Sequence, residues 1–304
     1  MHFGKLLFAI VLVAAIAGCT SSGSSVAFDQ NSGVRIDEFS FDLNDIYEGE
    51  TVTLFLKLQN VGAKTMTGNS RLWIYGPTMG GADKWSATPA IPEGGIDLPT
   101  TTFTPPDVAR RIPGAVHIEE MSLTAPTPLP ENMRRTDKFY ARVCYPYETE
   151  SITQLVASTR NQMRIEPLPV TDAITRASAG PIQLKMLSGE NLVAGRPIGI
   201  VFEVSDVGGG IATKPDGCGA SSGPDLAVAS INRVFVTVTV DGAAVSGCTD
   251  KEVLISKGMG TIYCMYTPAI GQSAPKMEYA ITAKARYNYY LTREASVTVN
   301  SNTL

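Results

Sequence analysis

Apolar and polar residues alternate one by one through many short segments of this chain, which is the pattern of β-strands with one buried face. The clearest case is residues 51–59, where Val52, Leu54, Leu56 and Leu58 share one face and mostly polar residues occupy the other. The same reasoning predicts strands at 71–76, 115–123 and 138–147, and a strand or a short helix at 152–158. The pattern therefore predicts an all-β protein.

Alternation is strongest in the second half of the chain, where turn residues separate seven apolar segments. Asp241 and Gly242 are typical of a two-residue hairpin turn, since glycine tolerates the positive φ that such a turn needs. Seven short strands at this spacing are typical of an immunoglobulin-like β-sandwich, and a small closed barrel is the alternative. The predicted strands are 181–186, 198–204, 232–240, 251–256, 260–266, 278–290 and 295–299.

Proline and small residues interrupt both periodicities at 166–181, which makes this stretch the best candidate for a domain boundary. We therefore predict two immunoglobulin-like β-sandwich domains in tandem, at 34–174 and 175–304. Residues 78–130 are rich in glycine and proline, and we expect long loops with one or two short strands there. The second domain is expected to fold alone.

The N-terminus has the pattern of an exported protein. Lys5 precedes an uncharged apolar run at 6–18, about 20 Å of helix, which is too short to span a bilayer and fits a cleaved signal. The run ends in Ile16-Ala17-Gly18-Cys19, which resembles the lipobox of prokaryotic lipoproteins. The resemblance implies a lipid on Cys19 and cleavage after residue 18. Residues 19–33 then form a flexible tether that begins with serine, threonine and glycine. An ordinary signal peptide is the alternative.

Charge and hydropathy limit the classes of binding partner that we expect. The formal net charge is −4 and no basic run occurs, so nucleic acid is not an expected partner. No second apolar segment approaches spanning length, so we expect membrane contact through the N-terminal lipid alone. An envelope protein or a glycan remains as the expected partner. We expect neither a cofactor nor a metal.

A 20-residue stretch, GETVTLFLKLQNVGAKTMTG at 49–68, resembles the opening strands of CARDB-type and related immunoglobulin-like adhesion modules. Together with the lipobox and YARVCYPYET at 140–149, it also resembles archaeal surface lipoproteins. The resemblance implies extracellular binding or structural work and no catalytic residues.

Four cysteines remain once Cys19 carries the lipid, and an exported chain permits disulfides. We favour Cys248 with Cys264, although a simple hairpin at 257–260 would place Cys264 opposite Val253. Cys218 could reach either partner. Cys144 shares a face with polar residues, and we expect it to be partly exposed. No C-x-x-C pair occurs, which argues against zinc.

Other chemistry is weakly indicated. His117 lies near two glutamates, but no second histidine follows it in the mature chain to complete a metal site. Ser221 matches G-x-S-x-G without the flanking strand and helix that a nucleophile elbow needs. Residues 206–210 lack the lysine of a phosphate loop, and 42–50 lack the spacing of a calcium loop.

The two tryptophans of the chain are expected in different environments. We expect Trp73, inside a strand, to be buried, and Trp85, in a glycine-rich loop, to lie on a binding surface. The leading hypothesis is a non-enzymatic, membrane-anchored extracytoplasmic lipoprotein serving in adhesion, envelope structure or partner binding. The alternatives are an assembly subunit that donates residues 24–36 as a strand to a neighbour, and a hydrolase that uses Ser221.

Overall fold

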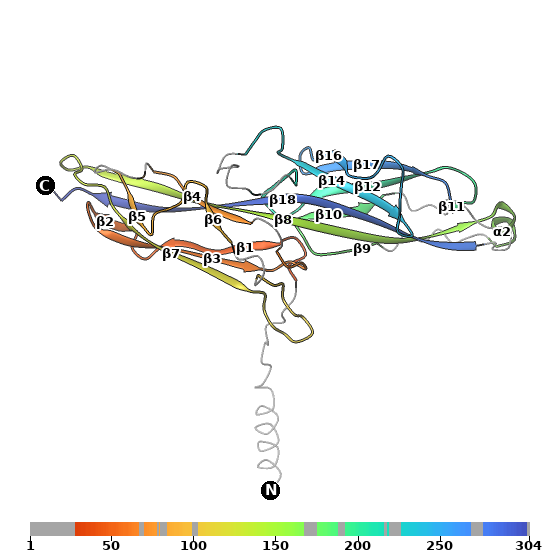
Figure 1. The fold of residues 1–304 in the computed structure, drawn as a ribbon, viewed down its shortest axis with the longest axis horizontal. Helices are drawn as coiled ribbons and strands as arrows, with labels where there is room; N and C mark the ends of the chain where they lie inside the picture. Colours follow the sequence, from red (N-terminus) through yellow and green to blue (C-terminus); the bar gives the residue numbers. More distant parts are fainter. Residues whose placement is uncertain are drawn as a thin grey trace, which may run out of the picture.

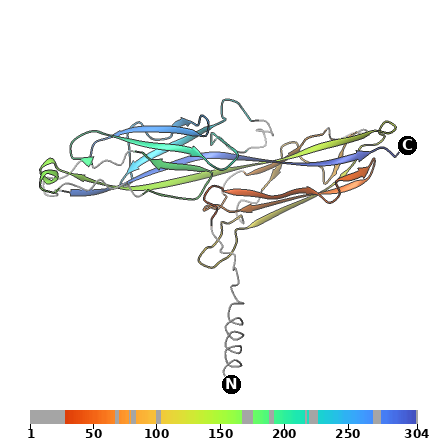
Figure 2. The same ribbon diagram turned by 180° about the vertical axis from the view of Figure 1, so that it is seen from behind.

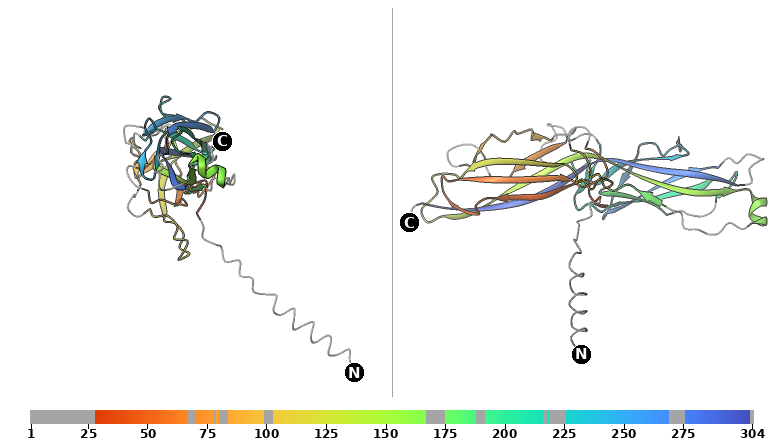
Figure 3. Two further views of the ribbon diagram at one scale, coloured as in Figure 1. Left: turned by 90° about the vertical axis from the view of Figure 1, so that its right-hand side faces the viewer. Right: turned by 90° about the horizontal axis from the view of Figure 1, so that it is seen from below.

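The computed structural model is all-β, as the alternating pattern predicts, and α2 (Arg160–Ile165) is its only helix within the described residues. The molecule is elongated, with two lobes of packed sheets following one another along its long axis (Figures 1 and 3). The predicted signal sequence, Cys19 and Ser221 lie outside the described residues. The structure describes residues 28–66, 70–77, 79, 84–98, 103–166, 175–187, 192–215, 218, 226–268 and 276–302.

Two strands of 25 residues, β8 (Arg134–Ser158) and β18 (Lys276–Asn300), pair antiparallel along their whole length. We call this pair the long ribbon, and Figure 1 shows it running through both lobes. The apolar alternation predicted two separate pieces for each strand, and this prediction was wrong. Polar stretches at 148–151 and 291–294 break the apolar alternation, but their backbone continues the ladder.

The first lobe places a four-stranded sheet, in the order β1–β3–β7–β5, against one half of the long ribbon. β4 lies beside β8 and extends the ribbon into a wider sheet, so the lobe has two layers. Leu54, Leu56 and Leu58 fill the space between them, as their shared face predicts. The strands are β1 (Val34–Phe41), β2 (Asp45–Tyr47), β3 (Thr51–Asn60), β4 (Arg71–Tyr75), β5 (Ser86–Thr88), β6 (Ile96–Asp97) and β7 (Val116–Thr124).

The second lobe packs the sheet β10–β12–β17 against the other half of the long ribbon, with β14 pairing beside β18. Its apolar residues and those of the first lobe form one continuous core. The strands are β9 (Thr175–Ala177), β10 (Ile182–Met186), β11 (Leu192–Val193), β12 (Ile198–Asp206), β13 (Ile211–Thr213), β14 (Arg233–Val240), β15 (Ala243–Ala244), β16 (Lys251–Leu254) and β17 (Met259–Tyr266).

The lobes do not follow the predicted domain boundary between residues 174 and 175. The long ribbon takes one strand from each predicted domain. The end of β18 also returns to the first lobe, where Thr298 and Asn300 pair in parallel with β2. Two self-contained consecutive domains would not share a strand pair in this way.

Four buried tyrosines occupy the middle of the long ribbon, where the lobes meet: Tyr145, Tyr147, Tyr287 and Tyr289. We call this cluster the tyrosine waist. Their ring centroids lie 6.0 to 6.2 Å apart. Each hydroxyl is hydrogen-bonded to a segment outside the ribbon, and Tyr287, which accepts from Ile182 N at 3.3 Å, also bonds within it, so the waist fastens both lobes to the same strands. The bonds join Tyr145 to Val34 N (3.3 Å), Tyr147 to Ala179 O (2.9 Å), Tyr287 to Thr149 Oγ1 (2.6 Å) and Tyr289 to Asp206 Oδ1 (2.7 Å).

Glycines make room for these rings. A Cβ on Gly62 would lie 2.4 Å from the Tyr147 hydroxyl, and one on Gly208 would lie 2.6 Å from the Tyr289 hydroxyl. The glycine motif at 206–210 therefore serves packing. Burial raises the pKa of the Asp206 carboxyl above its ordinary value, while the hydrogen bond from Tyr289 opposes that rise.

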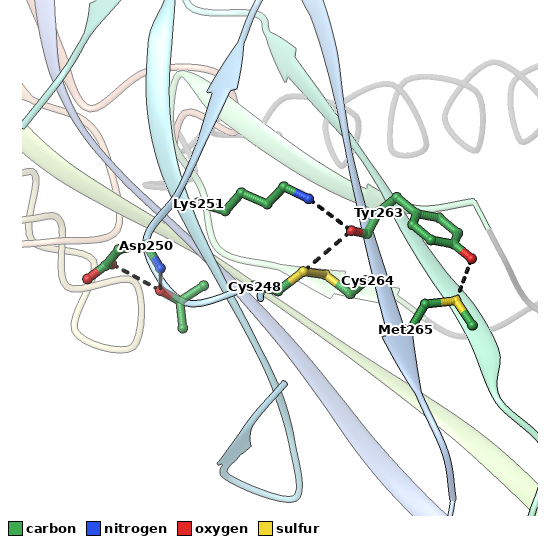
Figure 4. The surroundings of a disulfide bond; sticks show 7 residues. Cys248, Asp250, Lys251, Tyr263, Cys264 and Met265 are labelled. Carbon is green, nitrogen blue, oxygen red and sulfur yellow. Dashed lines mark hydrogen bonds between the residues drawn. A yellow bond between two sulfur atoms is a disulfide. The ribbon is translucent and has the colours of Figure 1, made fainter. Parts of the chain in front are cut away.

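The disulfide Cys248–Cys264, which the sequence analysis favoured, is present and links the two layers of the second lobe (Figure 4). Cys264 lies on β17, and the segment of Cys248 hydrogen-bonds to β14 through Val238 N. Reciprocal backbone hydrogen bonds between Ser256 and Met259 close a tight turn here, but no ladder continues from it that would place Cys264 opposite Val253. β16 pairs with β14, so it and β17 belong to opposite layers.

The shared ribbon predicts that the second half of the chain does not fold alone, contrary to the expectation from sequence. A truncated chain of residues 181–304 lacks β8, so β18 loses the strand that pairs with it from end to end. We expect circular dichroism to show no cooperative thermal transition for this chain, whereas residues 28–304 melt cooperatively. A cooperative melt of the truncated chain would show that the ribbon is not required.

Candidate functional site

The outward side of the large sheet in the first lobe carries a cluster of aromatic side chains, which we call the outer aromatic face: Trp73, Tyr75, Tyr140 and Tyr290. Trp73 stacks on Tyr290 with ring centroids 6.3 Å apart, and Tyr75 stacks on Tyr140 at 5.5 Å. The register explains the second pair, since Tyr75 and Tyr140 are direct cross-strand neighbours on β4 and β8.

Arg142 lies at the centre of this face, opposite Trp73 in the register. Its guanidinium carbon is 5.3 Å from the centre of the Tyr75 ring, and its Nε donates to Thr292 Oγ1 at 3.2 Å. The cation–π contact and the hydrogen bond hold the arginine flat against the sheet. The outer aromatic face is therefore a preformed surface.

A second disulfide, Cys144–Cys218, pins the segment after β13 onto the outer aromatic face. Both cysteines are buried in a small cluster with Trp73 and Tyr290, against which Leu226 packs. The expectation that Cys144 is partly exposed was therefore wrong. The cysteine does lie on the outward side of β8, as its alternation indicates, but its contacts with Cys218, Trp73 and Tyr290 bury it.

A groove of about 630 Å³ lies beside β4, next to the outer aromatic face. Its walls are mostly apolar, and Ser86 and Glu93 add polar groups. Trp73 contributes one wall, and its indole N–H is buried without a hydrogen-bond partner among the described residues. The residues around the groove are Trp73, Ile74, Tyr75, Gly76, Pro77, Met79, Trp85, Ser86, Ala87, Ala90, Ile91, Pro92 and Glu93.

The groove lies where a further strand could pair with β4. β6 pairs with β4 only at Arg71 and Leu72, and no strand of the described residues follows it along that side of β4. The chain that precedes β6, at Ile91 and Glu93, lines the groove instead. A sheet edge of this kind, next to an apolar groove, is the geometry that binds an extended peptide.

Trp85 is not the exposed binding residue that its loop predicted. The side chain is fully buried, its Nε1 donates to Asp137 Oδ2 at 2.7 Å, and its ring packs edge-on against Phe139. The partly buried carboxylate of Asp137 satisfies the indole N–H, which explains how a loop tryptophan enters the core. The prediction that Trp73 is buried was right, although it belongs to the small outward cluster.

The other sequence candidates are not brought into this site. His117 Nε2 lies 2.8 Å from Glu119 Oε1 on β7, and no further polar partner that would make a relay is found for this pair in the part of the chain that the structure describes. Among the described residues no group of three or more histidine, cysteine or acidic side chains is placed to hold a metal. No helix in the described part of the chain is long and apolar enough to cross a membrane.

Sequence reasoning missed Tyr140 and Arg142 as site residues. Both share the outward parity of Cys144 within the predicted strand 138–147, so alternation placed them together on one face. The missing information was the neighbour on that face: β4, which adds Trp73 and Tyr75, is fixed only by the register.

The comparisons with known proteins identify no family. No protein-family model and no curated protein matches the chain. A protein of unknown function from Porphyromonas gingivalis W83 aligns at 9% identity over 88% of this chain and 100% of its own, with a TM-score of 0.20. The Enterococcus faecalis MSCRAMM ACE, which binds its ligands by the collagen Hug model, aligns at 8% identity over 91% and 98%, with a TM-score of 0.16. Scores this low do not establish a shared fold.

Removal of the Cys144–Cys218 disulfide should lower the stability of the protein and expose Trp73. Because Cys144 and Cys218 are 74 residues apart, the chain-entropy model assigns their bond roughly 4 kcal/mol of stability. The double variant Cys144→Ser with Cys218→Ser should melt at a lower temperature. It should also make Trp73 accessible to acrylamide, as followed by fluorescence in a Trp85→Phe background. A Trp73 that stays protected would mean that the pinned segment does not depend on the bond.

Proposed function

We propose that this protein is a non-enzymatic, membrane-anchored extracytoplasmic lipoprotein that captures an extended segment of a partner protein, and so serves in adhesion or envelope structure. Its two lobes are immunoglobulin-like modules that share the long ribbon. The two disulfides fit an oxidising compartment outside the cytoplasm. Cys19 supplies the lipid.

The groove beside β4 is the observation that supports this function. An added strand would extend the sheet beyond Leu72, and apolar side chains of the partner would occupy the groove. Sugars need many polar partners, and the mostly apolar walls favour a peptide over a glycan.

The partner site can be tested in intact envelopes. A photoreactive amino acid in place of the exposed Ala90 should cross-link to a protease-sensitive partner. Adding Ile91→Arg should abolish the adduct, because a charged side chain would stand in the apolar groove. Leu254→Arg, the same change at an exposed position of the second lobe, should leave the adduct unchanged. An adduct that resists protease but yields to glycosidases would replace the peptide with a glycan.

The lipid anchor is tested separately. Cys19→Ser removes the thiol that would carry the acyl chain, so the protein should move from the membrane fraction to the soluble fraction after ultracentrifugation. A conservative change elsewhere in the tether, Ser21→Ala, serves as the control. Unchanged membrane partition of Cys19→Ser would contradict a lipoprotein.

The assembly alternative has less support in the structure. Its donor segment, 24–36, includes the start of β1, which already pairs with β3 inside the same molecule. Gln30 O also accepts hydrogen bonds from Gly180 N and Gln183 Nε2. Donation to a neighbour would require breaking these contacts.

A further inference from the structure

The described chain begins at the middle of the elongated molecule. Asp29 N donates to Val61 O of the first lobe at 2.8 Å, and Gln30 O accepts from Gly180 N of the second lobe at 3.1 Å. Gly33 packs against the rings of Tyr145 and Tyr147 in the tyrosine waist. Any tether that leads away from this point therefore holds the molecule at its waist, with one lobe extending to each side.

The tether is short compared with the molecule. Under the proposed function the lipid is attached to Cys19, and an extended chain from there to Phe28 reaches at most about 30 Å. The side of the molecule from which the chain starts therefore stays close to the lipid headgroups.

A turn at residues 107–112 projects on this same side. Asn60, next to Val61 at the chain start, donates from its backbone N to Ala115 O and from its side chain to Phe103 O, so it holds both ends of the segment that carries the turn. Figures 1 and 2 show this segment, which leads into β7, standing out from the long axis on the face opposite β4 and β6. Reciprocal backbone hydrogen bonds between Asp107 and Ile112 close the turn.

The turn and the start of β7 carry four exposed apolar side chains. Val108 is 42% exposed, Ile112 52%, Val116 45% and Ile118 57%. Val116 and Ile118 share the outward side of β7, so their exposure continues that of the turn.

The turn also carries two cations. Arg110 is mostly exposed and lies 3.6 Å from Asp107, and Arg111 makes no ion pair among the described residues. Apolar tips flanked by arginines are suited to the boundary between acyl chains and phosphate headgroups.

We propose that the turn at 107–112 docks onto the surface of the membrane that holds the lipid anchor. The occupant of this apolar patch is a lipid bilayer with anionic phosphate headgroups. The long axis then lies along the membrane, and the outer aromatic face and its groove point away from it, toward partners. This inference rests on the proposed lipid anchor. The turn supplies a contact with the membrane in addition to the lipid.

A fluorescence experiment on the full lipidated chain tests the docking. The chain is reconstituted into vesicles of phosphatidylcholine and phosphatidylglycerol in equal parts, with an environment-sensitive label on Val108→Cys. The control label is on Val228→Cys, which is 87% exposed in the segment pinned to the opposite face by Cys218. We expect a blue shift and protection from an aqueous quencher at 108 and neither effect at 228.

A charge reversal separates docking from anchoring. Arg110→Glu with Arg111→Glu should remove the blue shift at 108, while the protein still sediments with the vesicles through its lipid. The matched control, Arg160→Glu with Arg164→Glu on α2, should retain the blue shift.

The outcomes that overturn the proposal are distinct. Sedimentation with a water-exposed label at 108 leaves the anchor intact and refutes the docking. Equal protection at 108 and 228 refutes the orientation. Loss of sedimentation in the unaltered chain refutes the anchor and, with it, the docking.

Discussion

The end-to-end pairing of β8 with β18 is the interaction on which the rest of the structure depends. Each strand belongs to both lobes, so every other sheet forms by packing against or extending the same ribbon. Because β8 and β18 are separated by more than 100 residues of chain, the ribbon forms only after a large loop has closed, and this loop is the second lobe itself. The two lobes are therefore coupled in folding as well as in position.

The tyrosine waist turns this pairing into a rigid joint. A ribbon of two strands is flexible by itself, but the four tyrosines lock its centre to segments from both lobes through their hydroxyls. The neighbouring glycines allow those rings to approach the backbone closely. Burial raises the pKa of Tyr145 and Tyr287 well above the ordinary value, so these hydroxyls stay neutral throughout the physiological pH range and keep accepting from Val34 N and Ile182 N.

The chain enters the molecule at the waist, and this position relates the two surfaces of the first lobe to the proposed anchor. The chain start and the turn at 107–112 lie on one side, and the outer aromatic face lies on the other. Both faces belong to the first lobe, where two layers separate them. The disulfide Cys144–Cys218 makes the second lobe contribute to the same surface, since it holds a segment from beyond β13 over Trp73. A protein held at its middle thus presents its groove away from its anchor.

The sequence by itself determined the all-β class and the interior of strands such as β3, and it favoured the pairing of Cys248 with Cys264 that the structure shows. These features are local: alternation decides which face of a strand is buried, and two cysteines 16 residues apart need little chain to meet. It did not determine the continuous strands β8 and β18, because polar side chains at 148–151 hide a backbone ladder that only a distant partner completes. It also misplaced Trp85, whose burial depends on Asp137 more than 50 residues away. Register, layer assignment and the site built from Trp73, Tyr75 and Tyr140 are long-range properties, decided only when the long ribbon brings its neighbours together.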